Sequence, residues 1–282
     1  MAETLYNATA ELVKDGGDAR VIRVLPDQPK GRHLAGQYGS LGMPSEVHPG
    51  RLIKRPYSLS CSMINLETRQ LIDAQETPYY EFYFNRVTPR LAGPESLTPK
   101  LFRLRSGDRI FCGRKITGYY TLQDVPAGRH LLFISTLTGE SANNALIAQA
   151  LREGRWGRIS HLLVGTNGWR SLYEAEHDAL MRAVPTYRCR TLRVETYAAV
   201  EARLAEGLRD AARAEDELGF ALDPARSHVF LCGDPALIGA PAKQGAWRYV
   251  TPTHGAIPIL TAGGFSLRTR FKLGTIEYET YW

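Results

Sequence analysis

The 282-residue chain lacks several patterns that mark common classes of protein. No apolar run approaches the ~20 residues that a membrane-spanning helix needs, so we expect no membrane partner. The first residues show no basic segment followed by an apolar core, and we therefore expect no secretory signal and a cytoplasmic location. Neither a Cys/His finger pattern nor a run of interleaved basic and aromatic residues is present, which argues against a nucleic-acid partner.

Cysteine is scarce and scattered. The four cysteines are Cys61, Cys112, Cys189 and Cys232, and no two of them form a Cys-x-x-Cys pair. This spacing predicts neither a zinc site nor an iron–sulfur cluster in the chain. Scattered thiols also fit a reducing compartment, because a disulfide framework would require regular spacing.

The composition is that of a globular protein. Hydrophobic residues make up 44% of the chain and charged residues 23%, which is enough apolar material for a substantial core. The net charge of +6 is consistent with an acidic protein partner or with a phosphorylated small molecule. A solvated basic surface with no dedicated partner explains the same charge.

The first part of the chain, to about residue 126, contains short strand patterns separated by turns. The segments 20–25, 79–87, 108–112 and 118–122 are rich in β-branched or aromatic residues. Because no helical period separates them, they predict a small antiparallel β-barrel.

The second part alternates between strand and helix patterns. We expect buried strands at 130–135, 159–165 and 227–233, with a further strand within 187–197. Helical patterns occupy 144–153, 171–183 and 200–217. This alternation predicts an α/β domain with an open parallel sheet, which binds ligands at the carboxyl ends of its strands. We place the two domains at 1–126 and 127–282.

Arg55-Pro-Tyr-Ser58 is the most informative segment. On a strand, Arg55 and Tyr57 point to one face and Ser58 to the other. A guanidinium pairs with phosphate oxygens and a tyrosine ring packs on aromatic systems, so the group suits a ligand that carries a pyrophosphate and a flat ring. A strand with an exposed salt bridge is the alternative interpretation.

Seven segments occur in an order that resembles a known family. They are 35–42, 55–58, 97–108, 118–122, 136–140, 232–238 and the final Tyr281-Trp282. In this order they resemble the bacterial-type ferredoxin/flavodoxin–NADP reductases over residues 20–282. The resemblance implies an antiparallel β-barrel that binds FAD, followed by an α/β domain that binds the nicotinamide dinucleotide.

The resemblance also implies which residues bind FAD. Arg55 would contact the pyrophosphate, Tyr57 would lie against the isoalloxazine ring, and Ser58 would reach the ring near N5. The Leu97-Thr98 step would face the pyrophosphate or ribityl chain, and Trp282 would stack on the adenine. The implied FAD set is Arg55, Pro56, Tyr57, Ser58, Leu97, Thr98, Thr138 and Trp282. From the residues alone, Thr98 is equally a helix cap and Trp282 a loose terminus.

The implied NADP site differs from the family pattern in places. The Gly-x-Gly-x-x-Gly fingerprint is absent, and the turn at 135–143 takes its role of presenting a helix N-terminus to the pyrophosphate. Leu137 stands where a glycine is usual, although leucine adopts positive φ only at a cost, and Asn167 stands where an arginine is usual. The implied NADP set is Thr136, Thr138, Gly139, Arg170, Arg193, Gly233 and Asp234. Arg170 and Arg193 are otherwise surface arginines without a ligand.

Ser58, Cys232 and Glu279 are the implied catalytic residues. Cys232 begins a Cys-Gly-Asp-Pro segment at the carboxyl end of a buried strand, where a nicotinamide would lie. Glu279 matches an acid next to the flavin. The alternatives are a packing role for Cys232 and an exposed terminal carboxylate for Glu279.

The resulting expectation is an FAD-dependent oxidoreductase that exchanges electrons between NADP(H) and ferredoxin or flavodoxin. Hydride would pass between nicotinamide C4 and flavin N5. The carriers are acidic, which suits the basic residues Lys100, Arg103, Arg105, Arg109, Arg114 and Lys115. One alternative is a flavin-binding paralogue with impaired or altered nicotinamide binding, acting as an NADH-linked reductase or as a non-catalytic electron-transfer or binding subunit. The reductase component of an oxygenase is a third interpretation.

Overall fold

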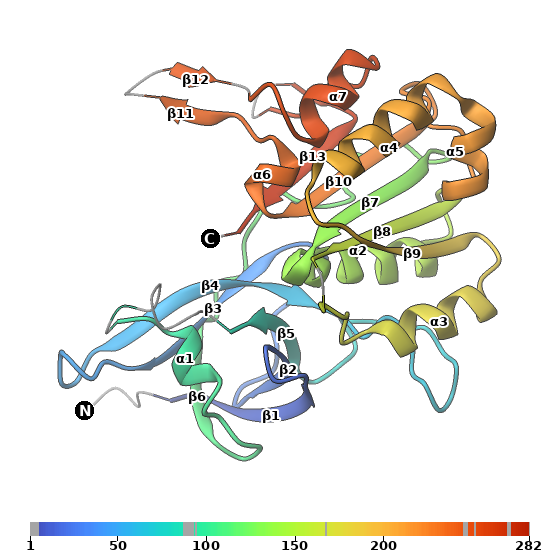
Figure 1. Ribbon diagram of the computed structural model, residues 1–282. Coiled ribbons are helices and arrows are strands. Elements are labelled where there is room, and N and C mark those ends of the chain that lie inside the picture. Colours follow the sequence, from blue (N-terminus) through green and yellow to red (C-terminus); the bar gives the residue numbers. More distant parts are fainter. Residues whose placement is uncertain are drawn as a thin grey trace.

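The structure consists of a β-barrel followed by an α/β domain (Figure 1). This computed structural model describes residues 6–86, 93, 95–166, 168–244, 248–250, 252–269 and 272–281. Within these ranges no helix is both long and apolar enough to cross a membrane. The predicted fold class, an antiparallel barrel followed by a parallel sheet with helices, is confirmed.

The barrel is closed and contains six strands in the order β1-β2-β5-β4-β3-β6. All of the strand pairs within it are antiparallel. Its interior is filled by alternating apolar side chains such as Val24, Leu41 and Phe82, all of which are buried. The strands are β1 (Ala8–Asp15), β2 (Ala19–Pro26), β3 (Tyr38–Pro44), β4 (Leu52–Ser60), β5 (Tyr80–Asn85) and β6 (Arg109–Cys112). The short helix α1 (Thr98–Leu101) lies between β5 and β6 in the chain.

The strand predicted at 118–122 is wrong. This segment forms bends instead, and only Thr117 makes an isolated bridge, to Tyr38. The aromatic pattern that suggested a strand serves packing against the second domain. The Tyr120 ring lies edge-on to Phe230 at 5.4 Å, and its hydroxyl donates to Asn143 Oδ1 at 2.6 Å. The segment is therefore a connection that packs on the second domain.

The α/β domain contains a five-stranded parallel sheet in the order β13-β10-β7-β8-β9. Its strands are β7 (His130–Thr136), β8 (Ile159–Gly165), β9 (Tyr187–Arg193), β10 (Ser227–Gly233) and β13 (Ile276–Thr280). The apolar runs predicted at β8 and β10 are buried along their whole length. Because the chain order reverses beside β7, the carboxyl ends of β7 and β10 form the switch point where such sheets bind ligands.

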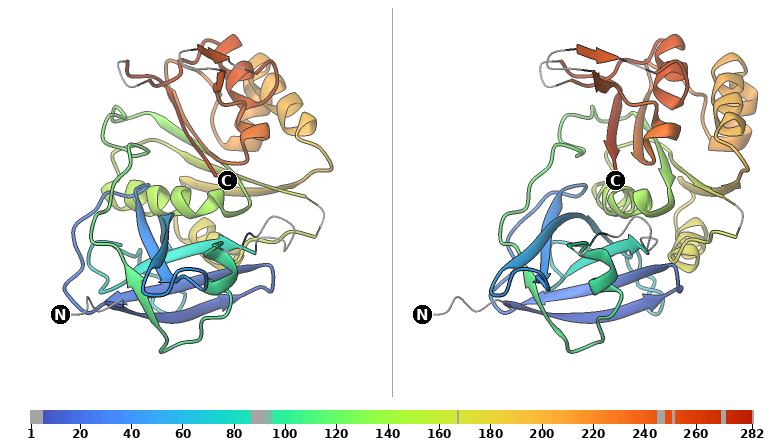
Figure 2. Two further views of the ribbon diagram at one scale, coloured as in Figure 1. Left: turned by 90° about the vertical axis from the view of Figure 1, so that its left-hand side faces the viewer. Right: turned by 60° about the vertical axis from the view of Figure 1, so that its left-hand side comes forward.

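Helices cover both faces of this sheet (Figures 1 and 2). The turn η1 (Leu137–Gly139) leads into α2 (Glu140–Glu153), which with α3 (Glu174–Ala183) lies between the sheet and the barrel. The opposite face packs against α4 (Ala198–Arg209), α5 (Ala211–Leu218), α6 (Pro235–Ile238) and α7 (Ala256–Ala262). The hairpin of β11 (Ala242–Gln244) and β12 (Arg248–Val250) projects beyond α6 (Figure 1).

Three helix predictions need correction at their ends. Helix α2 ends before Gly154, which adopts a left-handed conformation as a helix stop should, but it begins four residues earlier than expected. Helix α3 begins at Glu174 rather than at residue 171. The range 200–217 holds two helices, because the Asp210 carboxylate accepts a hydrogen bond from the Arg213 amide and caps a new helix.

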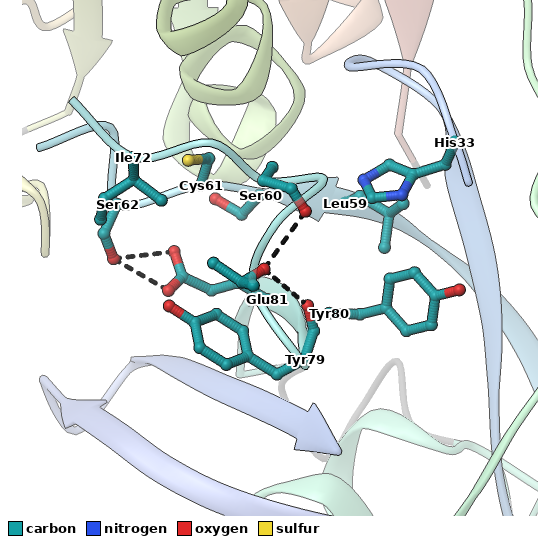
Figure 3. Close-up of a pocket in the computed structure, with 11 residues that line it drawn as sticks. His33, Leu59, Ser60, Cys61, Ser62, Ile72, Tyr79, Tyr80 and Glu81 are labelled. Atoms are coloured by element: carbon teal, nitrogen blue, oxygen red, sulfur yellow. Dashed lines mark hydrogen bonds between the residues drawn. The ribbon is translucent and has the colours of Figure 1, made fainter. Parts of the chain in front are cut away.

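A buried polar network joins α3 to the barrel. The Tyr173 hydroxyl donates to Glu81 Oε1 at 3.0 Å and lies 2.9 Å from Ser60 Oγ. Figure 3 shows Ser62 donating to both Glu81 oxygens, at 2.9 and 2.8 Å. The pocket beside these residues has a volume of only about 10 Å³, about the space of one water molecule, which fits a structural role for the network.

Candidate active site

Strand β4 presents the Arg55–Ser58 segment at the barrel edge next to the α/β domain. Arg55 is exposed, Tyr57 is half-buried and Ser58 is buried, so burial increases along β4 toward the α/β domain. The Arg55 guanidinium donates to the carbonyls of Lys54 at 2.8 Å and Glu95 at 3.3 Å. These two bonds hold the side chain in place and leave other N–H groups free for an anion.

Tyr57 connects β4 to α1. Its hydroxyl is 2.9 Å from Thr98 Oγ1, and its ring packs on Phe84 with centroids 5.9 Å apart. Burial raises the pKa of Tyr57, so the phenol stays neutral. Thr98 is the first residue of α1 and Leu97 occupies the N-cap position, so Thr98 is not the cap that the alternative interpretation expected. The Leu97 side chain is buried in the barrel core. Pro56 lies exposed between Arg55 and Tyr57.

The turn after β7 begins with a residue in the left-handed region, where glycine is usually found. Leu137 adopts φ = +48°, in the left-handed region. This conformation costs a non-glycine residue about 1–2 kcal/mol, so the surrounding contacts must hold it. One such contact is at Gly139, whose backbone lies so close to β10 that a Cβ there would be 2.1 Å from the Cys232 carbonyl oxygen. The turn is thus pressed directly onto the end of β10.

The end of β10 is locked to β7 by hydrogen bonds. The Asp234 amide donates to Thr136 Oγ1 at 2.6 Å, and the Asp234 carboxylate accepts from the Ala236 amide at 2.8 Å and caps α6. Gly233 has φ = +127°, and a Cβ there would meet Thr136 Oγ1 at 2.1 Å. Thr136, Gly233 and Asp234 therefore form one tight corner at the switch point. Thr138 is half-buried in the adjoining turn.

Cys232 and Glu279 are neighbours on adjacent parallel strands. Burial raises the pKa of the Cys232 thiol well above its usual value, and the nearby Glu279 adds to the shift. Burial also raises the pKa of Glu279, to about 7, and its Oε2 atom has no hydrogen-bond partner among the described residues. The site therefore holds a neutral thiol beside a carboxyl that titrates near neutral pH.

Tyr281 belongs to the final segment of the family resemblance, but the sequence assigned it no role in the site. Its hydroxyl is buried close to Ser58 and Cys232 but makes no well-formed hydrogen bond within the described ranges. Its amide donates to the Gly233 carbonyl at 3.0 Å. Tyr281 thereby places an aromatic side chain between β4 of the barrel and the end of β10. Its position near the chain end was the one available signal.

The three residues expected to be catalytic thus converge at the domain junction. Ser58 comes from β4, Cys232 from β10 and Glu279 from β13, and Tyr281 lies among them. Ser141 at the start of α2 reinforces the junction by donating to the Ser58 carbonyl at 3.1 Å. Trp282 and Asn167, two residues singled out from the sequence, lie outside the described residues.

A second cavity lies between α3 and β9. Its volume is about 270 Å³, and three arginines line it: Arg170, Arg190 and Arg193. The sequence pointed to Arg170 and Arg193 but missed Arg190, which precedes Arg193 by three residues on the same strand. Glu174 and Asp178 of α3 also line the cavity, so its charge is mixed with an excess of one cation.

Comparison with known proteins supports a relation to reductases. No protein-family profile matches the chain. The flavodoxin/ferredoxin–NADP reductase of Escherichia coli is 23% identical over 211 residues, which cover 72% of this chain and 75% of the relative. The corresponding protein of Buchnera aphidicola is 25% identical over 174 residues, covering 59% and 64% of the two chains.

Solved structures agree at the level of the fold. The ferredoxin NADP+ reductase of Neisseria gonorrhoeae, solved with bound FAD and NADP, superposes with a TM-score of 0.69 at 17% identity and 99% coverage of both chains. The ferredoxin–NADP+ reductase of Plasmodium falciparum, in complex with 2′P-AMP, gives a TM-score of 0.64 at 13% identity, covering 100% and 98% of the chains. The chain therefore has the fold of the ferredoxin–NADP reductases and is similar in sequence to the flavodoxin/ferredoxin–NADP reductases.

Proposed function

We propose that the chain is an FAD-dependent oxidoreductase that exchanges electrons between NADP(H) and ferredoxin or flavodoxin. The observation that carries the proposal is the junction at which Ser58 of the barrel meets Cys232, Glu279 and Tyr281 of the α/β domain. A flavin held on the barrel and a nicotinamide held on the sheet would meet at this junction. The similarity to flavodoxin/ferredoxin–NADP reductases supports the assignment.

The described residues fit FAD. Arg55 is exposed, restrained by two carbonyls and still has free donors for a pyrophosphate. Tyr57 offers a ring and a neutral hydroxyl held by Thr98. Glu279 Oε2 and the Tyr281 hydroxyl are buried polar atoms without a described partner, which is expected where a ligand supplies the missing hydrogen bonds.

When bound, FAD supplies the redox chemistry: it exchanges hydride with nicotinamide and passes electrons singly to a carrier. The protein has two tasks at the junction. Ser58, on the strand that carries Arg55 and Tyr57, would offer a hydroxyl donor to the flavin. Glu279, with a pKa of about 7, holds a proton there that is exchangeable near neutral pH.

Cys232 and the turn after β7 would position the nicotinamide. The Cys232 thiol stays protonated, because burial and Glu279 both raise its pKa, so it serves as a small polarisable surface and takes no part as a nucleophile. Leu137 has a left-handed backbone, the region that a glycine adopts at no cost, and the turn is closed on β10. At this position the departure from the family pattern would therefore be confined to the leucine side chain.

The arginine cavity supplies a site for the 2′-phosphate of NADP(H). Arg170 and Arg193 face one cavity at the edge of the sheet, and neither forms an ion pair with another described residue. Arg190 lies 3.9 Å from Glu217 and is partly neutralised. Two unpaired guanidiniums suit a phosphate dianion, because each offers several donors in a planar fork.

The electron partner would dock by charge, on fewer residues than the sequence suggested. Lys100 is buried, and it and Arg103 both pair with Glu46, while Arg109 pairs with Asp27. Arg105, Arg114 and Lys115 are exposed and pair with no acid among the described residues. The segment 113–117 follows β6 and is hydrogen-bonded to β3 at Ser40 and Tyr38, and β3 in turn pairs with β4 at Tyr57. An acidic carrier would therefore be steered toward the flavin side of the barrel.

The test begins with the purified protein and its visible spectrum. We expect bound flavin, anaerobic bleaching by NADPH, and NADPH-driven reduction of cytochrome c that depends on added ferredoxin or flavodoxin. NADH serves as the matched donor. A colourless protein that does not take up FAD would refute the cofactor assignment, whereas a flavoprotein that no nicotinamide reduces would refute the reaction while leaving the flavin site intact.

A further inference from the structure

The floor of the arginine cavity contains a second cluster of side chains with a different chemistry. His161 of β8, His177 of α3 and Cys189 of β9 each present one ligand atom, and these three atoms lie within 4.8 Å of one another. Both histidines are buried. His177 and Cys189 also contribute to the lining of the cavity. Their sequence spacing of 16 and 12 residues matches no zinc motif, which is why the sequence predicted no such site.

His177 is held in the manner of a metal ligand. Its Nε2–H donates to the buried Glu140 carboxylate, with 2.7 Å between Nε2 and Oε1. The Ser171 hydroxyl also donates to Glu140 Oε1, at 2.6 Å, and so fixes the carboxylate. In the neutral tautomer that donates Nε2–H to Glu140, the lone pair of His177 is on Nδ1, which lies 2.8 Å from the Tyr187 hydroxyl. A carboxylate behind a histidine is the usual outer support of a zinc-binding imidazole.

His161 offers one ring nitrogen to the same cluster. Its Nε2 is 2.7 Å from Ser135 Oγ, and its Nδ1 is buried without a partner among the described residues. Its ring lies edge-on to that of His177, with centroids 5.3 Å apart. In the tautomer that donates Nε2–H to Ser135, Nδ1 carries an unused lone pair. Such an orphaned buried nitrogen is costly unless something binds it.

We propose that His161, His177 and Cys189 bind a divalent transition-metal ion of the zinc type, with a water molecule from the arginine cavity as the fourth ligand. Two imidazoles and a thiolate form a ligand set that zinc accepts, and three protein ligands leave one position open. A tetrahedral ion needs ligand atoms about 3.3–3.6 Å apart, so the cluster would contract by about 1 Å and release the bond between Tyr187 and His177.

The ion would lie under the surface that the arginines form. It adds positive charge at the floor of the cavity, where Arg170 and Arg193 already gather, and its open position faces the same space. The inference does not depend on the proposed reductase function, because it concerns side chains outside the domain junction. Its test therefore measures metal binding and makes no use of turnover.

The experiment measures zinc bound to the purified full-length protein after chelator treatment, by titration against a chromophoric competitor. The wild type should bind one equivalent. Cys189→Ser should lower the affinity at least about tenfold, and Glu140→Gln, which leaves His177 less well oriented, should lower it about 10–100-fold. Cys112→Ala removes a buried thiol in the barrel, and His254→Gln removes an exposed imidazole, so both controls should bind as the wild type does.

X-ray absorption at the zinc edge gives an independent measurement. The bound ion should show one sulfur at about 2.3 Å and two or three nitrogen or oxygen neighbours at about 2.0 Å. A spectrum without sulfur, or equal zinc binding by the wild type and Cys189→Ser, would overturn the proposal. Circular dichroism of each variant shows whether a lost affinity reflects lost folding, and His161→Gln provides a second removal of one ligand.

Discussion

The two halves of the candidate active site are built in different ways. On the barrel side, Arg55, Tyr57 and Ser58 come from one continuous strand within four residues. On the α/β side, the corresponding residues come from the ends of β7, β10 and β13 and from the cavity beside β9. A contiguous motif is detectable in a sequence, whereas a scattered one exists only after strands far apart in the chain have been brought together.

The two halves also differ in how they tolerate change. The barrel residues depend on strand alternation, so almost any sequence that keeps the strand keeps their directions. The turn on the α/β side depends on close backbone packing at Gly139 and Gly233, where a Cβ would lie 2.1 Å from another atom. Leu137 shows the consequence, because the packing imposes a left-handed backbone on a residue that disfavours it.

The largest expected effect is at Glu279, where the halves meet. Its pKa is raised from 4.5 to about 7 by burial. Below pH 4.5 the carboxyl is protonated in the folded and unfolded chains alike. As pH rises toward 7 the unfolded chain loses the proton first, so the free energy of unfolding falls, by about 3 kcal/mol once the pH exceeds about 7.

Replacing Glu279 by glutamine should remove this dependence. Denaturant unfolding at a series of pH values should give similar stabilities near pH 4, with Glu279→Gln more stable by up to about 3 kcal/mol at pH 8. A stability difference that stays constant from pH 4 to pH 8 would mean that Glu279 is solvated, and the junction would then be open rather than buried.

The next largest effect is expected on the barrel side of the site, at Arg55. Arg55→Ala should weaken FAD binding about 10–100-fold, because a hydrogen bond to a charged group contributes about 1.5–3 kcal/mol. Arg51→Ala, an exposed arginine just before β4, is the matched control and should bind FAD normally. Equilibrium dialysis with flavin fluorescence measures both. Equal affinities would show that Arg55 does not contact the pyrophosphate.

On the α/β side of the site, Arg193 provides the test. Arg193→Ala should raise the KM for NADPH about tenfold, roughly 1.4 kcal/mol, and leave the KM for NADH and the flavin content unchanged. Arg182→Ala, an exposed arginine of α3 outside the cavity, is the control. A parallel loss with NADH and NADPH would place Arg193 elsewhere in the dinucleotide site, away from the 2′-phosphate.

A smaller effect is expected for partner docking. Charge reversal at Arg114 and Lys115, which are exposed and unpaired among the described residues, should slow ferredoxin-dependent turnover about threefold at low salt and much less at high salt. Reversal at Arg109, which already pairs with Asp27, is the comparison. If Arg109 has the stronger effect, the carrier approaches another face of the barrel.

The smallest expected effect is at Leu137. Leu137→Gly relieves about 1–2 kcal/mol of backbone strain but adds the chain entropy of glycine, so the net change in stability should stay within about 1 kcal/mol. Because the backbone already has the required shape, the KM for NADPH should change little. A fall in KM of more than about tenfold would instead show that the leucine side chain obstructs the dinucleotide.

The sequence pattern of apolar runs, alternating residues and turn formers was enough to predict the fold class and most strands of the parallel sheet. The buried runs at β7, β8 and β10, the glycine stop after α2 and the Arg55–Ser58 strand depend on local periodicity and steric preference, which act within a few residues. The single helix predicted at 200–217 and the strand predicted at 118–122 were wrong, because a side-chain cap at Asp210 starts a second helix and Tyr120 packs on Phe230.

Only the folded chain decided which distant groups touch. Three placements are not encoded in any single segment: Tyr281 near Ser58, Arg190 in one cavity with Arg170, and the cluster of His161, His177 and Cys189. Each depends on strand order and on how whole elements pack. Residues that are remote in sequence come together only when whole helices and strands pack. The burial of apolar side chains between those elements offsets the loss of chain entropy that the packing costs.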